Sequence, residues 1–257
     1  HPLDGIYTDG CLQVRDSANG AYGCGYTDVS GNRIPTTPFF AVRDAWKRIY
    51  KVVKADPKRI IVNHQSFALP VMTVGFSDML YTAEHEDYTD LLTARLRFSP
   101  GPWGTYITLL GSSEHAWSSL HTMTGLLVGT SLWGSGVVER DDWARKAAKL
   151  REAYEKFGYA ECEFFPFFTA ENELVSEALP ANIHIAGYLK KGQKLLLLVA
   201  NYNPRPVTAA IKLKVEKLGF SPREAHSALT GVSMPLAGAT VTVPLLPENF
   251  QLVEVWP

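Results

Sequence analysis

The chain has 257 residues, of which 46% are hydrophobic and 20% charged, so it can bury the core of one large domain or two smaller ones. The net charge is -1 and no basic run occurs, which argues against a nucleic-acid-binding protein, because such proteins neutralise phosphates with clustered cations. An aromatic content of 11% excludes general disorder.

The first half of the chain alternates short apolar runs with helical patterns. The apolar runs predict strands at residues 5–8, 59–63, 78–83, 105–110 and 131–133. Apolar residues at helical spacing predict a helix from about Pro38 to Asp56-Pro57, with a long glycine-rich loop over residues 11–37 before it. Two further helices are expected to start near Ser112 or Ser113 and near Asp141 or Asp142, the last of them ending at Gly158.

This alternation of strands and helices predicts an α/β fold. Continuous apolar strands between amphipathic helices are typical of a parallel sheet that is covered on both faces. A doubly wound sheet and a (β/α) barrel both satisfy the pattern. Neither a GxGxxG motif nor a P-loop follows any of the predicted strands, which disfavours a nucleotide-binding protein.

The second half of the chain reads as a succession of short strands. Residues 195–200 form an apolar run that predicts a fully buried strand. Residues 207–215, 240–245 and 250–255 alternate apolar with polar side chains, which predicts half-buried strands of a small antiparallel β-sandwich. Residues 161–178 are expected to connect the two parts, so we predict domains at residues 1–178 and 179–257.

Membrane and cysteine signals are weak. The uncharged stretch over residues 116–138 contains polar and glycine residues throughout, so it predicts a buried helix followed by a buried strand instead of a membrane span. Cys11, Cys24 and Cys162 show no CxxC spacing and predict neither a disulfide scaffold nor a zinc site, although Cys11 and Cys24 could pair. We expect no membrane, metal or cofactor partner.

Two carboxylates at predicted strand ends are the candidate catalytic residues. Asp9 follows the first strand and Glu84 follows the third. In an α/β barrel the catalytic groups come from the carboxyl ends of strands, and glycoside hydrolysis needs two carboxyl groups, one of which protonates the leaving oxygen. The competing interpretations are an Asp that bonds a turn backbone and a Glu near a helix N-terminus.

Histidines lie near the same strand ends. His64 and His85 are candidate substrate-binding residues, although a histidine in such a place is more often a hydrogen-bonding wall residue than a catalyst. A metal site made by His64, Glu84 and His85 stays open as an alternative. It lacks HExxH or any other dense ligand spacing.

Three further side chains are candidates for binding a sugar. Tyr7 lies in the first predicted strand, and Trp103 lies in a rigid Pro- and Gly-rich turn that could present its ring to a cleft. Flat aromatic faces suit the C–H faces of sugars, but a single Trp is as often a packing wedge. Arg15 lies in the long loop and could bind hydroxyl groups or simply face the solvent.

Four stretches carry a resemblance to a known enzyme class: residues 5–10 (GIYTDG), 43–50 (RDAWKRIY), 61–66 (IVNHQS) and 78–84 (DMLYTAE). Together they resemble the second half of a glycoside hydrolase catalytic barrel. The chain is most similar to bacterial proteins grouped near glycoside hydrolase family 123, with the melibiase type as a more distant relative. Its last part resembles the β-sandwich that follows such barrels.

The resemblance implies that residues 1–178 form about five βα units at the C-terminal end of a (β/α)8 barrel. The upstream half would then be missing, in keeping with a chain that starts at His1, and a secreted or periplasmic protein is expected. In the melibiase arrangement Asp9 matches the nucleophile and Glu84 the acid/base. Family 123 enzymes resemble a type with an adjacent Asp-Glu pair, and this chain has no Asp-Glu dipeptide, so N-acetylhexosamine chemistry is not carried over.

The leading hypothesis is therefore a fragment of a retaining glycoside hydrolase, with activity not necessarily complete in the fragment, that acts on a carbohydrate substrate through Asp9 and Glu84. The sequence spacing by itself does not distinguish retention from inversion. The alternative is a non-catalytic carbohydrate-binding or structural protein on a hydrolase-like scaffold. A metal-dependent hydrolase that uses His64 and His85 is a third hypothesis.

Overall fold

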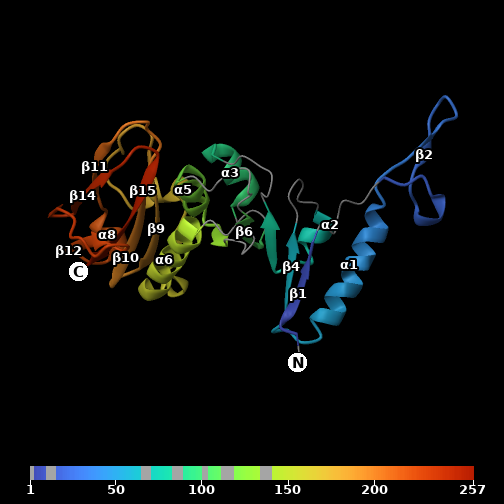
Figure 1. Cartoon of the computed structure of the whole chain (residues 1–257), viewed down its shortest axis with the longest axis horizontal. Coiled ribbons are helices and arrows are strands. Elements are labelled where there is room, and N and C mark those ends of the chain that lie inside the picture. The colour runs from blue at the N-terminus through green and yellow to red at the C-terminus, as the bar shows by residue number, and fades with distance from the viewer. Residues whose placement is uncertain are drawn as a thin grey trace. The chain divides into compact units, whose positions relative to one another are not determined.

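The computed structural model describes residues 3–9, 16–64, 71–82, 89–99, 104–110, 119–133 and 141–257 (Figure 1). The chain divides into two compact units. The first unit comprises His1–Glu86 and Pro100–Leu110, and the second unit comprises Asp87–Ser99 and Gly111–Pro257. Helices and strands occur in both units, so the fold belongs to the mixed α/β class that the sequence predicts.

A parallel sheet forms the centre of the first unit. Its strands are β1 (Gly5–Thr8), β4 (Ile60–His64), β5 (Met79–Thr82) and β6 (Tyr106–Leu110), which lie in the order β1-β4-β5-β6. Every adjacent pair is parallel. All four strands were predicted from apolar runs, and their observed ends differ from the predicted ones by a single residue at most.

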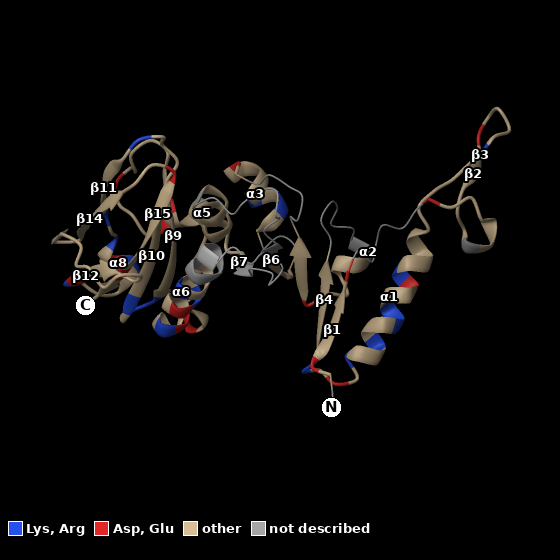
Figure 2. Cartoon of the chain, viewed as in Figure 1, with Lys and Arg blue, Asp and Glu red and all other residues tan. Residues whose placement is uncertain are grey.

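Helix α1 (Phe39–Val53) covers one face of this sheet. Its buried Trp46 packs in one cluster with Ile61 of β4 and Ile6 of β1. The helix begins directly after Pro38, as predicted, because proline has no N–H to lose in the first turn. Figure 2 shows charged residues along α1, whereas β1 and β4 contain no Lys, Arg, Asp or Glu, as is typical of strands in a parallel sheet.

The other face of the sheet is more open. Tyr7, Ile60 and Tyr106 point to this face and remain 52%, 46% and 44% exposed. On the helix-covered face, Ile61, Leu80 and Ile107 are fully buried. This face is therefore less covered than the opposite face in the described part of the chain.

The region predicted as a long loop contains a small hairpin. It is built from β2 (Tyr26–Thr27) and β3 (Arg33–Ile34), preceded by the single turn η1 (Gly20–Tyr22). The Asp28 carboxylate closes the hairpin turn by accepting from the backbone N–H of Asn32 and Ser30, and these bonds lower its pKa. Strands of two residues leave no periodic signal, which is why the sequence indicates only a loop here. The one-turn helix α2 (Val71–Val74) was likewise not predicted.

Two antiparallel sheets make up much of the second unit. The larger is ordered β12-β15-β10-β9-β8, from β12 (Glu224–Ser227), β15 (Asn249–Trp256), β10 (Lys194–Asn201), β9 (Ile183–Lys190) and β8 (Glu163–Phe165). The smaller is ordered β11-β14-β13, from β11 (Val207–Lys212), β14 (Thr240–Leu245) and β13 (Leu236–Ala237). The predicted alternation at residues 207–212 and 240–245 is confirmed by their burial.

Strand β10 is buried on both of its faces. Leu195, Leu197 and Val199 lie in a core that also holds Ile211 and Val241 of the smaller sheet. The intervening residues Leu196, Leu198 and Ala200 pack in a second core, with helices α5 (Ser119–Val128) and α6 (Asp141–Phe157). The predicted fully buried strand is thus confirmed, and so is the end of α6, where Gly158 takes a left-handed φ of 75°.

Several elements of the second unit were not predicted. These are α3 (Leu91–Phe98), η2 (Tyr159–Glu161), α7 (Phe167–Glu173), α8 (Val215–Leu218), β8, β9, β12 and β13. The expected strand over residues 207–215 ends at Lys212 and is followed by α8, so that prediction was too long. The predicted short strand is present as β7 (Ser131–Trp133).

The predicted connection over residues 161–178 contains two elements of regular structure. Strand β8 within it already pairs with β9, and α7 follows. The domain division at residues 178 and 179 stays a prediction. Among the described helices, none combines the length and the apolar character needed to cross a membrane.

Candidate functional site at the carboxyl ends of β1 and β4

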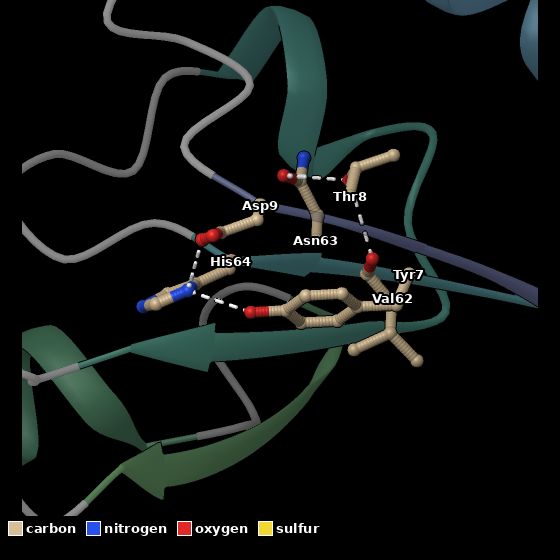
Figure 3. Close-up of polar contacts among 6 residues, drawn as sticks. All are labelled: Tyr7, Thr8, Asp9, Val62, Asn63 and His64. Atoms are coloured by element: carbon tan, nitrogen blue, oxygen red, sulfur yellow. Dashed lines mark hydrogen bonds and ion pairs between the residues drawn. The ribbon is translucent and has the colours of Figure 1, made fainter.

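Three of the predicted site residues come together where β1 and β4 end. The parallel register pairs Thr8 with Asn63 and His64 with Tyr81. Asp9, one residue beyond Thr8, therefore lies level with His64 and points toward it (Figure 3). Tyr7 lies two residues earlier on the same face of β1, since alternate strand residues share a face.

A single nitrogen joins these three residues. His64 Nδ1 lies 2.8 Å from Asp9 Oδ1 and 2.8 Å from the Tyr7 hydroxyl oxygen (Figure 3). The His64 side chain is only 8% exposed, whereas the Asp9 side chain is 74% exposed. The site is thus a solvent-facing carboxylate fixed by a buried imidazole.

Aromatic rings hold the imidazole in place. The Tyr81 ring meets the His64 ring edge-on at 5.4 Å and the Tyr7 ring edge-on at 6.2 Å, measured between ring centroids. Edge-to-face contacts of this kind stabilise ring pairs by about 0.5–1.5 kcal/mol beyond their buried area. His64 is therefore packed into the wall of the site, which was one of the two interpretations of its sequence position. It also forms a hydrogen bond with Asp9.

A buried polar network lies on the helix-covered face of the same strand ends. The Thr8 hydroxyl lies 3.2 Å from the Val62 carbonyl oxygen and 3.4 Å from Asn63 Oδ1, both of which can accept its proton. Asn63 in turn donates through Nδ2 to Ser77 Oγ at 3.4 Å. Asn63 is fully buried, so these bonds satisfy a side chain that would otherwise be costly to bury.

This network fixes the backbone that carries Asp9. Sequence reasoning missed it, although Asn63 is a polar residue inside an otherwise apolar strand and gave a signal. A buried amide at a strand end needs specific partners, and here they come from β1 and from the segment after α2.

The remaining predicted residues, Arg15, Glu84, His85 and Trp103, lie outside the described residues. Strand β5 ends at Thr82, which is buried and stands two positions before Glu84. Among the described residues, no group of His, Cys, Asp and Glu side chains is arranged to hold a metal ion. The metal hypothesis needed His85 and is left without support from this part of the chain.

No protein-family model matches the chain, and no curated protein matches it significantly. Solved structures do match. A GH27 β-L-arabinopyranosidase from Geobacillus stearothermophilus matches with a TM-score of 0.52 and 15% identity, over 84% of this chain and 54% of that chain. An alpha-amylase from Anoxybacillus matches with a TM-score of 0.53 and 12% identity, over 86% and 57%.

A third match is a Bacteroides fragilis protein assigned as an alpha-galactosidase/melibiase, with a TM-score of 0.51 and 11% identity, over 85% of this chain and 52% of that one. The scaffold is thus similar to those of glycoside hydrolases. At such identities the likeness concerns the fold alone. The chain spans about half the length of these structures.

Proposed function

We propose that this chain belongs to a glycoside hydrolase that cleaves an O-glycosidic bond with two carboxyl groups. Asp9 is the nucleophile or stabilising carboxylate, and Glu84 is the general acid/base. The observation that carries the proposal is the position of Asp9. Its solvent-facing carboxylate stands at the carboxyl end of a parallel strand, held by the buried His64, in a glycosidase-like scaffold.

The order of the strands supports this pairing. β4 separates β1 from β5, so the strands that precede Asp9 and Glu84 are two spacings apart, or about 10 Å. The carboxyl groups of glycosidases stand about 5–10 Å apart, the shorter distances belonging to retaining enzymes. If the Asp9 and Glu84 side chains lean toward each other, the distance between their carboxyl groups falls in that range.

The finer parts of the proposal follow from the sequence resemblance. The first 178 residues would be part of a (β/α)8 barrel, residues 179–257 a β-sandwich, and the reaction a retaining one. A further set of βα units, outside this chain, would complete the barrel. Tyr7, Arg15, His85 and Trp103 would line the sugar subsite. The Asp-Glu pair typical of family 123 is absent from this chain, so the proposal does not include the chemistry of that family.

The two roles are separable with aryl glycosides of graded leaving-group ability. Asp9→Asn should lower kcat by about a thousandfold or more on every substrate, because bond formation to the sugar is lost. Glu84→Gln should lower kcat/KM by about 10²–10⁴-fold on poor leaving groups and far less on dinitrophenolates, which depart without a proton.

Asp44→Asn, which changes an exposed carboxylate on α1, is the matched control and should turn over normally. Unchanged turnover in both the Asp9 and the Glu84 variants would contradict the assignment. Glycan binding without turnover by the complete protein would favour the carbohydrate-binding alternative.

A further inference from the structure

We propose that His64 is the positioning residue for Asp9, and that Tyr7 is the second partner of the same imidazole N–H. This inference rests on the proposed role of Asp9 and adds to it an assignment of the two oxygens of the carboxylate. Oδ1 is held by His64, and Oδ2 is the oxygen that meets the sugar.

The proton in the 2.8 Å contact between His64 and Asp9 belongs to His64 Nδ1. An ionised carboxylate can only accept hydrogen bonds, so the imidazole must donate. A neutral imidazole carries one N–H, which assigns His64 to the Nδ1–H tautomer. Hydrogen bonds to a charged acceptor are about twice as strong as neutral ones, so Asp9 is the preferred acceptor of this proton.

Tyr7 lies at the same 2.8 Å from the same nitrogen. Because Nδ1 already bears its proton, the Tyr7 oxygen faces the N–H as a second acceptor and cannot donate to it. The relation reverses when the Asp9 carboxylate is removed. Nδ1 can then give up its proton and accept from the Tyr7 hydroxyl, which moves the ring proton to Nε2.

The arrangement orients a side chain that would otherwise be mobile. Asp9 is the first residue after β1 and its side chain is largely exposed, so alone it would sample several rotamers. The buried His64 ring, packed against Tyr81, offers its donor in one direction only. Holding one oxygen this way turns the other toward the open face of the sheet, and such orientation can contribute about 10²-fold to a rate.

The pair also suits the charge changes of the proposed reaction. In the first step the bond between Asp9 Oδ2 and the anomeric carbon forms while the bond to the leaving oxygen breaks, and Glu84 gives its proton to that oxygen. Asp9 becomes a neutral ester and therefore accepts the His64 N–H more weakly. The Tyr7 oxygen, which lies against the same nitrogen, then takes a larger share of that hydrogen bond. Water then cleaves the ester, its proton passes to Glu84, and the Asp9 carboxylate returns.

The tautomer can be read by NMR without any enzyme activity. In the full chain labelled with ¹⁵N-histidine, His64 should show a protonated Nδ1 and an unprotonated Nε2 at neutral pH. Asp9→Ala should reverse this pattern, because no carboxylate then holds the proton on Nδ1. Asp44→Ala is the control and should leave the His64 signals unchanged. The same tautomer in the unaltered chain and in Asp9→Ala would overturn the proposal.

Two substitutions test the positioning role in catalysis. His64→Asn places an amide N–H close to the Nδ1 position, whereas His64→Gln places it close to Nε2. We expect kcat within about tenfold of the unaltered protein for Asn and about 10²-fold lower for Gln, with KM little changed in both. A merely structural histidine predicts equal losses, and equal losses would count against the proposal.

Tyr7→Phe provides a variant that keeps the packing of the site, with Tyr106→Phe as its control on the same face of the sheet. Tyr7→Phe should lower kcat, and Tyr106→Phe should not. If the complete protein, with the βα units outside this chain, hydrolyses no glycoside, the proposed function fails, while the NMR result still decides whether His64 positions Asp9.

Discussion

At the scale of single residues, two exposed aspartates show how a hydrogen-bond donor in a fixed position orients a surface carboxylate. Asp9 receives the N–H of the buried His64. Asp90 precedes α3 and accepts the backbone N–H of Thr93 at 2.7 Å, which makes it the N-cap of that helix. The contact of Asp90 depends on its ionised carboxylate, so it responds to protonation.

The cap makes the stability of α3 dependent on pH. The hydrogen bonds from Thr93 lower the pKa of Asp90 in the folded chain. The stabilisation is therefore fully present above the pKa of an unfolded Asp, near 4, and is lost as the pH falls through the lowered value. The difference in the free energy of unfolding between the unaltered chain and Asp90→Ala should be largest at neutral pH and shrink below about pH 4.

Urea unfolding over pH 2.5–7 measures this difference. Asp90→Asn is the matched control, because Asn also caps helices but does not titrate. Its advantage over Asp90→Ala should stay constant across the range. The unaltered chain and Asp90→Ala should not differ as much in free energy of unfolding at the lowest pH as at neutral pH. An equal difference would contradict the assignment of the cap.

At the scale of elements, the junction between α5 and β7 depends on Gly129. This residue has a φ of 86°, and its N–H donates to the Leu126 carbonyl as the helix ends. A Cβ at this position would collide with the ring of Phe164 in β8. Only glycine both takes the left-handed conformation without strain and leaves room for the ring.

Two alanine substitutions separate the requirement for a left-handed backbone from the requirement for space beside Phe164. Gly129→Ala should destabilise the fold by about 1–2 kcal/mol for the left-handed backbone and by about 1–3 kcal/mol more for the overlap with Phe164. Gly231 has a φ of 72° and nothing near its missing Cβ, so Gly231→Ala should show the backbone cost alone. Equal losses in thermal or urea unfolding would contradict the packing argument.

At the scale of the whole molecule, the two units differ in how their sheets are covered. The first unit has a parallel sheet with one face open in the described residues, where Tyr7 and Tyr106 are about half exposed. In the second unit β10 has paired neighbours on both sides and hydrophobic cores on both faces. We expect the second unit to be the more stable, because amide protection follows buried apolar contact.

Leu197→Ala tests whether the units unfold separately. Leu197 is fully buried in β10, so its truncation should cost about 2–5 kcal/mol. Hydrogen exchange should become faster in β9, β10 and β15 and stay unchanged in β1 and β4. Leu246→Ala, at a position that is 63% exposed, is the control. An equal loss of protection in β4 would indicate one cooperative molecule.

The local pattern of the sequence determined much of the fold. Apolar runs predicted β1 and β4, and helical spacing predicted α1 and α6, because the apolar residues of these elements are either continuous or recur on one helix face. Elements with mixed faces were missed. In α3 the exposed Leu92 and Leu96 blur the apolar stripe, and in β9 the small residues Ala186 and Gly187 interrupt the alternation that marks a strand.

The candidate site shows the same division. Asp9, Tyr7 and His64 could be chosen from the sequence because each stands in or just after a predicted strand. Their meeting at one nitrogen was decided only by the tertiary structure, because Asp9 and His64 are 55 residues apart and depend on the parallel register of β1 with β4. Hydrophobic periods along a chain determine which faces are buried, whereas a contact between distant polar groups depends on which strands become neighbours, and only packing fixes that.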